Sequence, residues 1–114
     1  MSITIYHNPR CGKSREGLKL LEEAGVEFQT RLYLKDPVSK EELSEVVQKL
    51  GISAEGLLRK KEAIFKEEYA NKSLSEEDCL DAMLTHPKLI ERPIVVNGDK
   101  AIIGRPPSLI SDIL

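Results

Sequence analysis

A helical segment lies between two β-prone segments near the N-terminus, and this order constrains the fold more than any other feature of the chain. Residues 3–6 (Ile-Thr-Ile-Tyr) form the first β-prone run, and residues 11–24 carry leucines at helical spacing before Gly25. Residues 27–34 return to an alternating pattern. A helix between two strands predicts a parallel, right-handed βαβ unit.

The middle of the chain, approximately residues 38–90, has a helical pattern. Helix-capping serines at positions 39, 53 and 75 predict three helices in this insert. Leu74 and Cys79 stand at the two ends of a hydrophobic staple around the third start.

The last part of the chain predicts a hairpin and a helix. Residues 94–96 and 100–103 are β-prone, and Asn97-Gly98 between them favours a type I′ turn. A final helix begins at Pro106-Pro107. Its predicted inner face consists of Leu109, Ile110, Ile113 and Leu114.

This order matches the thioredoxin architecture, an α/β fold with a four-stranded mixed sheet and a helical insert between strands 2 and 3. We expect residues 1–114 to form one such domain, because the chain is too short for two. In that topology the third strand lies antiparallel beside the first. His7, Cys11, Arg92 and Arg105 should then converge at one end of the sheet.

Composition excludes several functional classes. Lys plus Arg number 17 and Asp plus Glu 19, so the net charge of −2 gives no support for direct nucleic-acid binding. No apolar run is long enough to span a membrane, and the N-terminus does not resemble a leader. The two cysteines are 68 positions apart and show no Cys-x2-Cys spacing of a zinc site. We expect a cytoplasmic monomer with reduced thiols, no metal and no bound cofactor.

Cys11 is the candidate nucleophile. It stands between a strand end and a helix start, where unpaired backbone N–H groups and nearby cationic residues favour a thiolate. The alternative is a buried cysteine that acts as a small apolar residue. A phosphatase-type Cys-x5-Arg loop is disfavoured, because position 17 is Gly17. Position 14 is Ser14, so an intermediate on Cys11 needs an outside thiol such as glutathione, while Cys79 is assigned to the core.

The other candidate site residues each have two interpretations. Ser14 either donates a hydrogen bond to the Cys11 thiolate or caps the helix. His7 either supports that thiolate, directly or by orienting the loop, or is structural. Arg92 and Arg105 precede prolines and suit a multi-oxygen anion, or they are solvated surface arginines. Arg59 belongs by periodicity alone to a solvated basic patch at 57–61.

Four motifs resemble the glutaredoxin-dependent arsenate reductases, the ArsC family. They are His-Asn-Pro-x-Cys-Gly-x-Ser-Arg at 7–15, Leu-Leu-Arg-Lys at 57–60, His-Pro-x-Leu-Ile-x-Arg-Pro-Ile-Val-Val at 86–96 and Arg-Pro at 105–106. The resemblance implies that Cys11 attacks arsenate, that glutathione is the co-substrate, and that glutaredoxin is the partner that releases arsenite. It also implies substrate-binding roles for Arg59, Arg92 and Arg105, and support of the thiolate by His7 and Ser14.

The chain looks most like the short chromosomal branch of this family, since it ends soon after Arg105 and carries Arg10 where the dedicated resistance enzymes have a small residue. Two alternatives stay open. One is a noncatalytic regulator of the Spx type that binds RNA polymerase, although Ser14 breaks the Cys-x-x-Cys motif of its redox-sensing members. The other is a glutathione-dependent thiol transferase.

Overall fold

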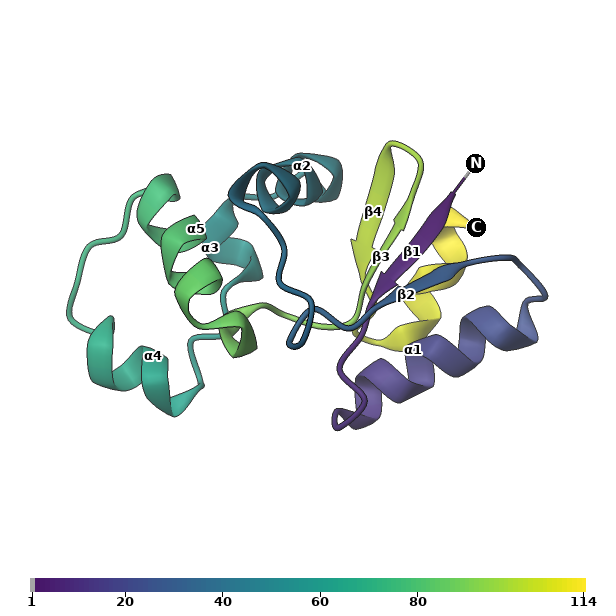
Figure 1. Ribbon diagram of the computed structural model, residues 1–114, viewed down its shortest axis with the longest axis horizontal. Helices are drawn as coiled ribbons and strands as arrows, with labels where there is room; N and C mark the ends of the chain where they lie inside the picture. The colour runs from purple at the N-terminus through teal and green to yellow at the C-terminus, as the bar shows by residue number, and fades with distance from the viewer. Residues whose placement is uncertain (1) are drawn as a thin grey trace. The chain divides into compact units, whose positions relative to one another are not determined.

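The computed structural model describes residues 2–114, which divide into two compact units. One unit consists of residues 2–36 and 92–114 and contains the sheet. The other, Pro37–Glu91, contains the helices of the predicted insert (Figure 1). The single domain over residues 1–114 stays a prediction. Within residues 2–114, no helix combines the length and apolar character needed to cross a membrane.

The sheet unit has a thioredoxin-like, four-stranded mixed sheet, which confirms the predicted fold class. Its strands are β1 (Ile3–Tyr6), β2 (Gln29–Arg31), β3 (Ile94–Asn97) and β4 (Lys100–Ile103), and helix α1 (Gly12–Glu23) connects β1 to β2. The strand order is β2-β1-β3-β4. Strand β1 is parallel to β2 and antiparallel to β3, which is antiparallel to β4. The register pairs Tyr6 with Ile94 and Ile94 with Ile103.

One face of the sheet carries the core of this unit. Ile3, Ile5 and Val95 pack with Leu21 of α1 and with Ile110 of the C-terminal 3₁₀ helix η2 (Pro107–Ile113). Both helices therefore cover the same face of the sheet, and α1 is held with its N-terminus at the end of β1 where the chain leaves the sheet (Figure 1).

Two glycines bring α1 and the end of β4 close to Pro93. A Cβ atom at Gly17 would lie 3.0 Å from both Pro93 Cγ and Ile110 Cδ1, and one at Gly104 would lie 3.0 Å and 2.9 Å from the same atoms. Neither position has room for a side chain unless its neighbours move. An arginine at position 17, which a phosphatase-type loop requires, would therefore meet Pro93 and Ile110.

The helical unit has four helices rather than the three predicted. They are α2 (Lys40–Leu50), α3 (Ala54–Leu57), α4 (Ala63–Glu68) and α5 (Glu76–Thr85), followed by the 3₁₀ turn η1 (Pro87–Leu89). The serine hydroxyls at positions 39, 53 and 75 each accept a hydrogen bond from a first-turn N–H, as predicted. The prediction missed α4, whose single buried side chain, Phe65, gives no helical periodicity.

Three predicted details of the sheet unit were wrong. Asn97 pairs with Lys100, so the hairpin loop is Gly98-Asp99, and only Gly98 has a positive φ (63°). Glycine with positive φ at the first central position is typical of a type II′ turn, not type I′. Strand β2 has only three residues.

The last helix is 3₁₀, and its predicted inner face was also wrong in part. Ile110 is fully buried, but Leu114 is 44% exposed and Leu109 and Ile113 are only partly buried. Apolar residues spaced three apart fit a 3₁₀ helix as well as an α-helix, and so the sequence pattern did not separate the two.

Candidate functional site

The loop between β1 and α1 places Cys11 at the start of the helix. Cys11 is the N-cap residue of α1, with extended backbone angles (φ −97°, ψ 124°). Its N–H donates to the Asn8 carbonyl at 3.0 Å, and its carbonyl accepts from the Arg15 N–H at 3.0 Å. Among residues 2–114, no side chain caps the first turn of α1 at this N-cap, so the amide groups at positions 12–14 are available to a bound anion or to the sulfur.

A buried hydrogen-bond cluster supports this loop from behind. The Ser14 hydroxyl, which is fully buried, lies 2.7 Å from His7 Nδ1 and accepts the Asn8 N–H at 2.9 Å. His7 is itself only 5% exposed. Ser14 does not cap the helix in the usual sense, because its hydroxyl binds residues that precede the N-cap. The cluster fixes the path of the chain from the end of β1 to Cys11.

The charge state of His7 follows from its surroundings. Burial lowers the pKa of His7 below its ordinary value of 6.5, the hydrogen bond with Ser14 raises it in part, and the nearby charge of Arg15 lowers it again. A lowered pKa keeps His7 neutral near pH 7. At neutral pH the histidine therefore contributes a hydrogen bond to the loop and not a positive charge.

Two further contacts hold the outer side of the loop. The Asn8 side chain accepts the Arg10 N–H at 3.0 Å, which closes a tight turn. Arg15 Nη1 donates to the Pro9 carbonyl at 3.1 Å from the first turn of α1. Sequence reasoning did not assign these roles, although Asn-Pro is a turn signal that favours the Asn8 contact.

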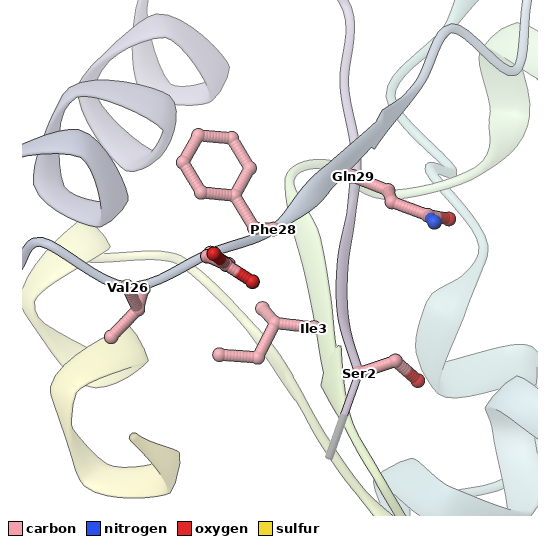
Figure 2. Close-up of a pocket in the computed structure, with 6 residues that line it drawn as sticks. Ser2, Ile3, Val26, Phe28 and Gln29 are labelled. Atoms are coloured by element: carbon pink, nitrogen blue, oxygen red, sulfur yellow. The ribbon is translucent and has the colours of Figure 1, made fainter.

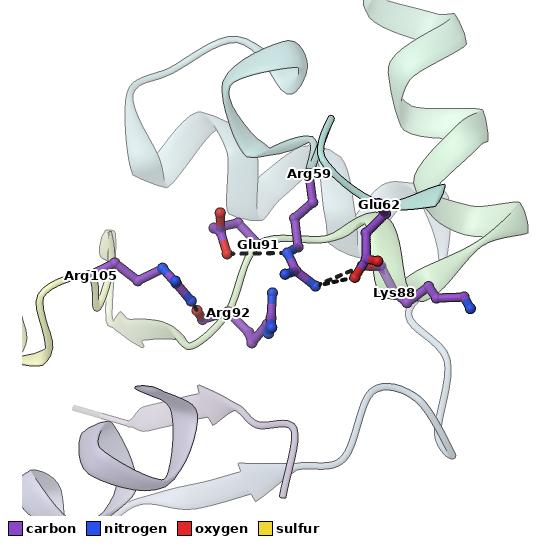
Figure 3. Close-up of polar contacts among 6 residues, drawn as sticks. All are labelled: Arg59, Glu62, Lys88, Glu91, Arg92 and Arg105. Carbon is purple, nitrogen blue, oxygen red and sulfur yellow. Dashed lines mark hydrogen bonds and ion pairs between the residues drawn. The ribbon is translucent and has the colours of Figure 1, made fainter. Parts of the chain in front are cut away.

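Arg92 and Arg105 lie at the sheet edge that also contains His7. The peptide bonds Arg92-Pro93 and Arg105-Pro106 are both cis. The Gly104 N–H donates to the Pro93 carbonyl at 2.8 Å, and Arg105 Nη1 lies 3.4 Å from the Arg92 carbonyl. Figure 3 shows the Arg105 side chain extending toward Arg92. Because Tyr6, Ile94 and Ile103 are paired across the sheet, the residues next to them come together at this edge, as the strand order predicts.

Arg59 belongs to the helical unit, where two carboxylates hold it. Its Nη1 lies 2.6 Å from Glu62 Oε1, and its Nε lies 3.6 Å from Glu91 Oε1 (Figure 3). Its side chain is 22% exposed, so it is not part of the solvated patch that periodicity alone predicts. Arg59 and Glu62 lie between α3 and α4, at the two ends of a turn in which the Glu62 N–H donates to the Arg59 carbonyl at 3.3 Å. The role of Arg59 at Cys11 stays a prediction.

Cys79 is placed in the interior of the helical unit. It lies in α5, is 1% exposed, and burial raises the pKa of its thiol. The capping box at the start of α5, between Ser75 and Asp78, fixes the turn that carries it. A buried, protonated thiol is a poor nucleophile, which agrees with the core assignment.

A hollow of about 610 Å³ lies at the other end of the sheet unit. Ser2, Ile3, Val26, Phe28 and Gln29 line it with Glu27, as Figure 2 shows. Because β1 runs from Ile3 to Tyr6, this hollow is at the opposite end of the strand from His7. Its lining residues include no cysteine or histidine, whereas the opposite end of β1 leads through His7 to Cys11.

Comparison with known proteins identifies close relatives over the whole length. Residues 6–113 match the sequence model of the ArsC family. The chain is 47% identical to an arsenate reductase of Haemophilus influenzae over 100% of both chains, and 51% identical to the uncharacterized protein YfgD of Escherichia coli K12 over 98% of this chain and 96% of that one. The solved structure of an arsenate reductase from Vibrio cholerae superposes with a TM-score of 0.94 at 46% identity, covering 100% of this chain and 98% of that one.

Proposed function

Because this chain belongs to the ArsC family, we propose that it reduces arsenate to arsenite with the Cys11 thiolate as the nucleophile. The observation that carries the proposal is the position of Cys11 as the N-cap of α1, with the first-turn amides uncapped by side chains of residues 2–114. Those amides bind an oxyanion against the sulfur that attacks it. Relatives named arsenate reductase at 46–47% identity support arsenate as that oxyanion.

The first step joins sulfur to arsenic. The Cys11 thiolate attacks the arsenic(V) centre, an S–As bond forms, and an arsenate oxygen leaves as water after it takes up protons. The developing negative charge on the remaining oxygens is stabilised by the helix amides and by the guanidinium groups of Arg92 and Arg105, which lie at the same sheet edge as His7. Membership of the ArsC family is the support for assigning Arg59, in the helical unit, as a third substrate-binding arginine.

Ser14 and His7 stabilise the Cys11 thiolate together, through the placement of the protons in their hydrogen bond. The Ser14 hydroxyl has a single proton and already accepts the Asn8 N–H. If His7 carries its proton on Nδ1, it donates to Ser14 Oγ at 2.7 Å and leaves the hydroxyl proton for Cys11. Ser14 stands three residues after Cys11, on the same face of the helix start, which suits this contact. In this arrangement neutral His7 directs the Ser14 hydroxyl toward the sulfur.

The reduction uses two external thiols. Glutathione displaces a second oxygen as water and forms a Cys11–S–As–S–glutathione adduct. A glutaredoxin thiolate then attacks the glutathione sulfur, and a mixed disulfide forms. The electron pair of the broken S–As bond stays on arsenic, which goes from arsenic(V) to arsenic(III). Water then cleaves the remaining S–As bond, so that arsenite leaves and the Cys11 thiol is restored. The buried Cys79 gives the chain no accessible second thiol among the described residues.

The test is arsenite production from arsenate with glutathione and a purified glutaredoxin. We expect turnover by the wild type, none by Cys11→Ser, and near wild-type turnover by Cys79→Ala, which removes the buried thiol without adding a polar group. Arsenate, and sulfate more weakly, should also slow the alkylation of Cys11.

Two results would contradict the proposal. One is that no arsenite forms and no anion slows the alkylation of Cys11, which is the result expected of a noncatalytic regulator. The other is reduction of mixed disulfides without reduction of arsenate under the same conditions, which is the result expected of a glutathione-dependent thiol transferase.

A further inference from the structure

A groove beside the Cys11 loop is not used by the steps described so far. It has a volume of about 360 Å³ and is lined by residues 7–10 of the loop and by Leu32, Leu34 and Lys35 after β2. Strands β1 and β2 are parallel, so the segments that follow them leave the sheet at the same edge. The His7 N–H donates to the Arg31 carbonyl at 2.9 Å and ties the two segments together.

The walls of the groove are apolar and its charges are positive. Pro9, Leu32 and Leu34 supply the apolar surface, and Leu34 is one of three large apolar side chains that are exposed among the described residues, at 42%. Arg10 and Lys35 supply two cations. Neither side chain has an ion-pair partner among residues 2–114, whereas their neighbour Arg31 is paired with Asp36 at 2.8 Å.

These properties favour a small anionic ligand whose methylene groups can lie along the apolar walls. The volume lies in the range of small-molecule sites. Two unpaired cations complement two carboxylates. Cys11 does not line the groove but directly follows Arg10, so the groove ends one residue from the nucleophile.

We propose that this groove binds glutathione, with its two carboxylates at Arg10 and Lys35 and its thiol directed to the arsenic on Cys11. This inference rests on the proposed function, because it assigns the site from which the first external thiol displaces an arsenate oxygen. Glutathione is a tripeptide with two carboxylates, one ammonium group and one thiol, so it is a net anion, and its size fits the groove. The competing assignment is a docking site for an acidic segment of glutaredoxin, and the experiment must distinguish it from a glutathione site.

The kinetic test uses the double variant Arg10→Ala/Lys35→Ala. At saturating arsenate and glutaredoxin, its KM for glutathione should rise roughly tenfold, while its KM values for arsenate and for glutaredoxin stay within about twofold of the wild type. Lys100→Ala is the matched control, since Lys100 is an exposed cation without an ion pair in the described chain, at the hairpin end of β4. An unchanged KM for glutathione overturns the proposal. A raised KM for glutaredoxin alone assigns the groove to the protein partner instead and also overturns it.

A binding test separates this proposal from the proposed function. S-methylglutathione has no free thiol, so its binding to the Cys11→Ser variant does not depend on arsenate chemistry. We expect S-methylglutathione to change the backbone NMR chemical shifts of the protein mainly at residues 8–10 and 32–35. These changes should be lost in Cys11→Ser/Arg10→Ala/Lys35→Ala. Binding at these residues without arsenite production contradicts only the proposed function. Arsenite production without binding or shifts there contradicts only the groove.

Discussion

The Ser14 hydroxyl lies 2.7 Å from Nδ1 of His7, and both side chains are buried in the sheet unit. The same hydroxyl accepts the Asn8 N–H. One serine therefore connects the end of β1, the loop and the first turn of α1.

Replacing Ser14 by alanine should cost both stability and reactivity. The Asn8 N–H and His7 Nδ1 would lose a buried partner, which destabilises the fold by about 1–3 kcal/mol. Denaturant unfolding measures this loss, and Cys11 alkylation, followed by mass mapping, should slow severalfold. Ser73→Ala is the control, because Ser73 is exposed. Unchanged stability and alkylation in Ser14→Ala would show that the hydroxyl supports neither the loop nor the thiolate.

The lowered pKa of His7 predicts a pH dependence of stability. As pH falls through about 6.5, the unfolded histidine takes up a proton that the folded one still resists, so the unfolded state gains stability and the fold loses it. The asparagine in His7→Asn keeps a hydrogen-bonding group near Nδ1 but does not titrate. The wild type should therefore lose more stability than His7→Asn between pH 7.5 and pH 5, measured by unfolding at each pH. His86 is present in both proteins and cancels in the difference. Parallel pH profiles would contradict the prediction.

The ion pair between Arg59 and Glu62 predicts a variant with tighter anion binding. Glu62 Oε1 lies 2.6 Å from Arg59 Nη1, so under the proposed mechanism an oxyanion must compete with a carboxylate for this guanidinium. Glu62→Gln should lower the KM for arsenate about threefold, and Arg59→Ala should raise it. Glu55→Gln is the control, because Glu55 pairs with the exposed Lys60. A higher KM in Glu62→Gln would show that Glu62 positions Arg59 rather than competing for it.

The arginines at the sheet edge should not tolerate lysine. Arg92→Lys and Arg105→Lys keep the charge but lose the planar fork, which should lower kcat/KM for arsenate about tenfold. Melting temperatures measured in parallel should change little. Arg31→Lys is the control, since Arg31 is paired with Asp36. Wild-type kcat/KM in both test variants would show that these arginines do not bind the substrate.

Gly17→Ala should destabilise the protein although alanine favours helices. The new Cβ would lie 3.0 Å from Pro93 and Ile110, and this overpacking costs about 1–3 kcal/mol against a propensity gain of up to about 1 kcal/mol. Gly56→Ala is the helical control, because its Cβ would meet Ile52 at an ordinary 3.4 Å. Chemical denaturation measures the free energy of unfolding of both variants. Equal values would mean that Pro93 and Ile110 move aside for the new Cβ without destabilising the protein.

The sequence predicted the strand order and the position of Cys11 because these depend on strong local signals. Alternating apolar residues, capping serines and a helix that follows a strand each have few structural alternatives. Helix α4 was missed because Phe65 is its only buried residue, and the hairpin register was wrong because both Asn97-Gly98 and Gly98-Asp99 can form a tight turn.

The finer geometry of the site was beyond the sequence for a different reason. The contacts of Ser14 with His7 and Asn8 depend on how the loop folds back over six or seven positions. No residue pattern specifies that path.

The burial of Cys79 has a consequence for how this protein would behave in a changing thiol environment. Cys79 is only 1% exposed against 9% for Cys11, and both thiols are free, so the chain has, among its described residues, no internal disulfide in which to store an oxidation and release it later. Under the proposed mechanism every catalytic cycle must draw both electrons from outside. Its rate of arsenite production would therefore depend directly on the concentrations of reduced glutathione and glutaredoxin around it.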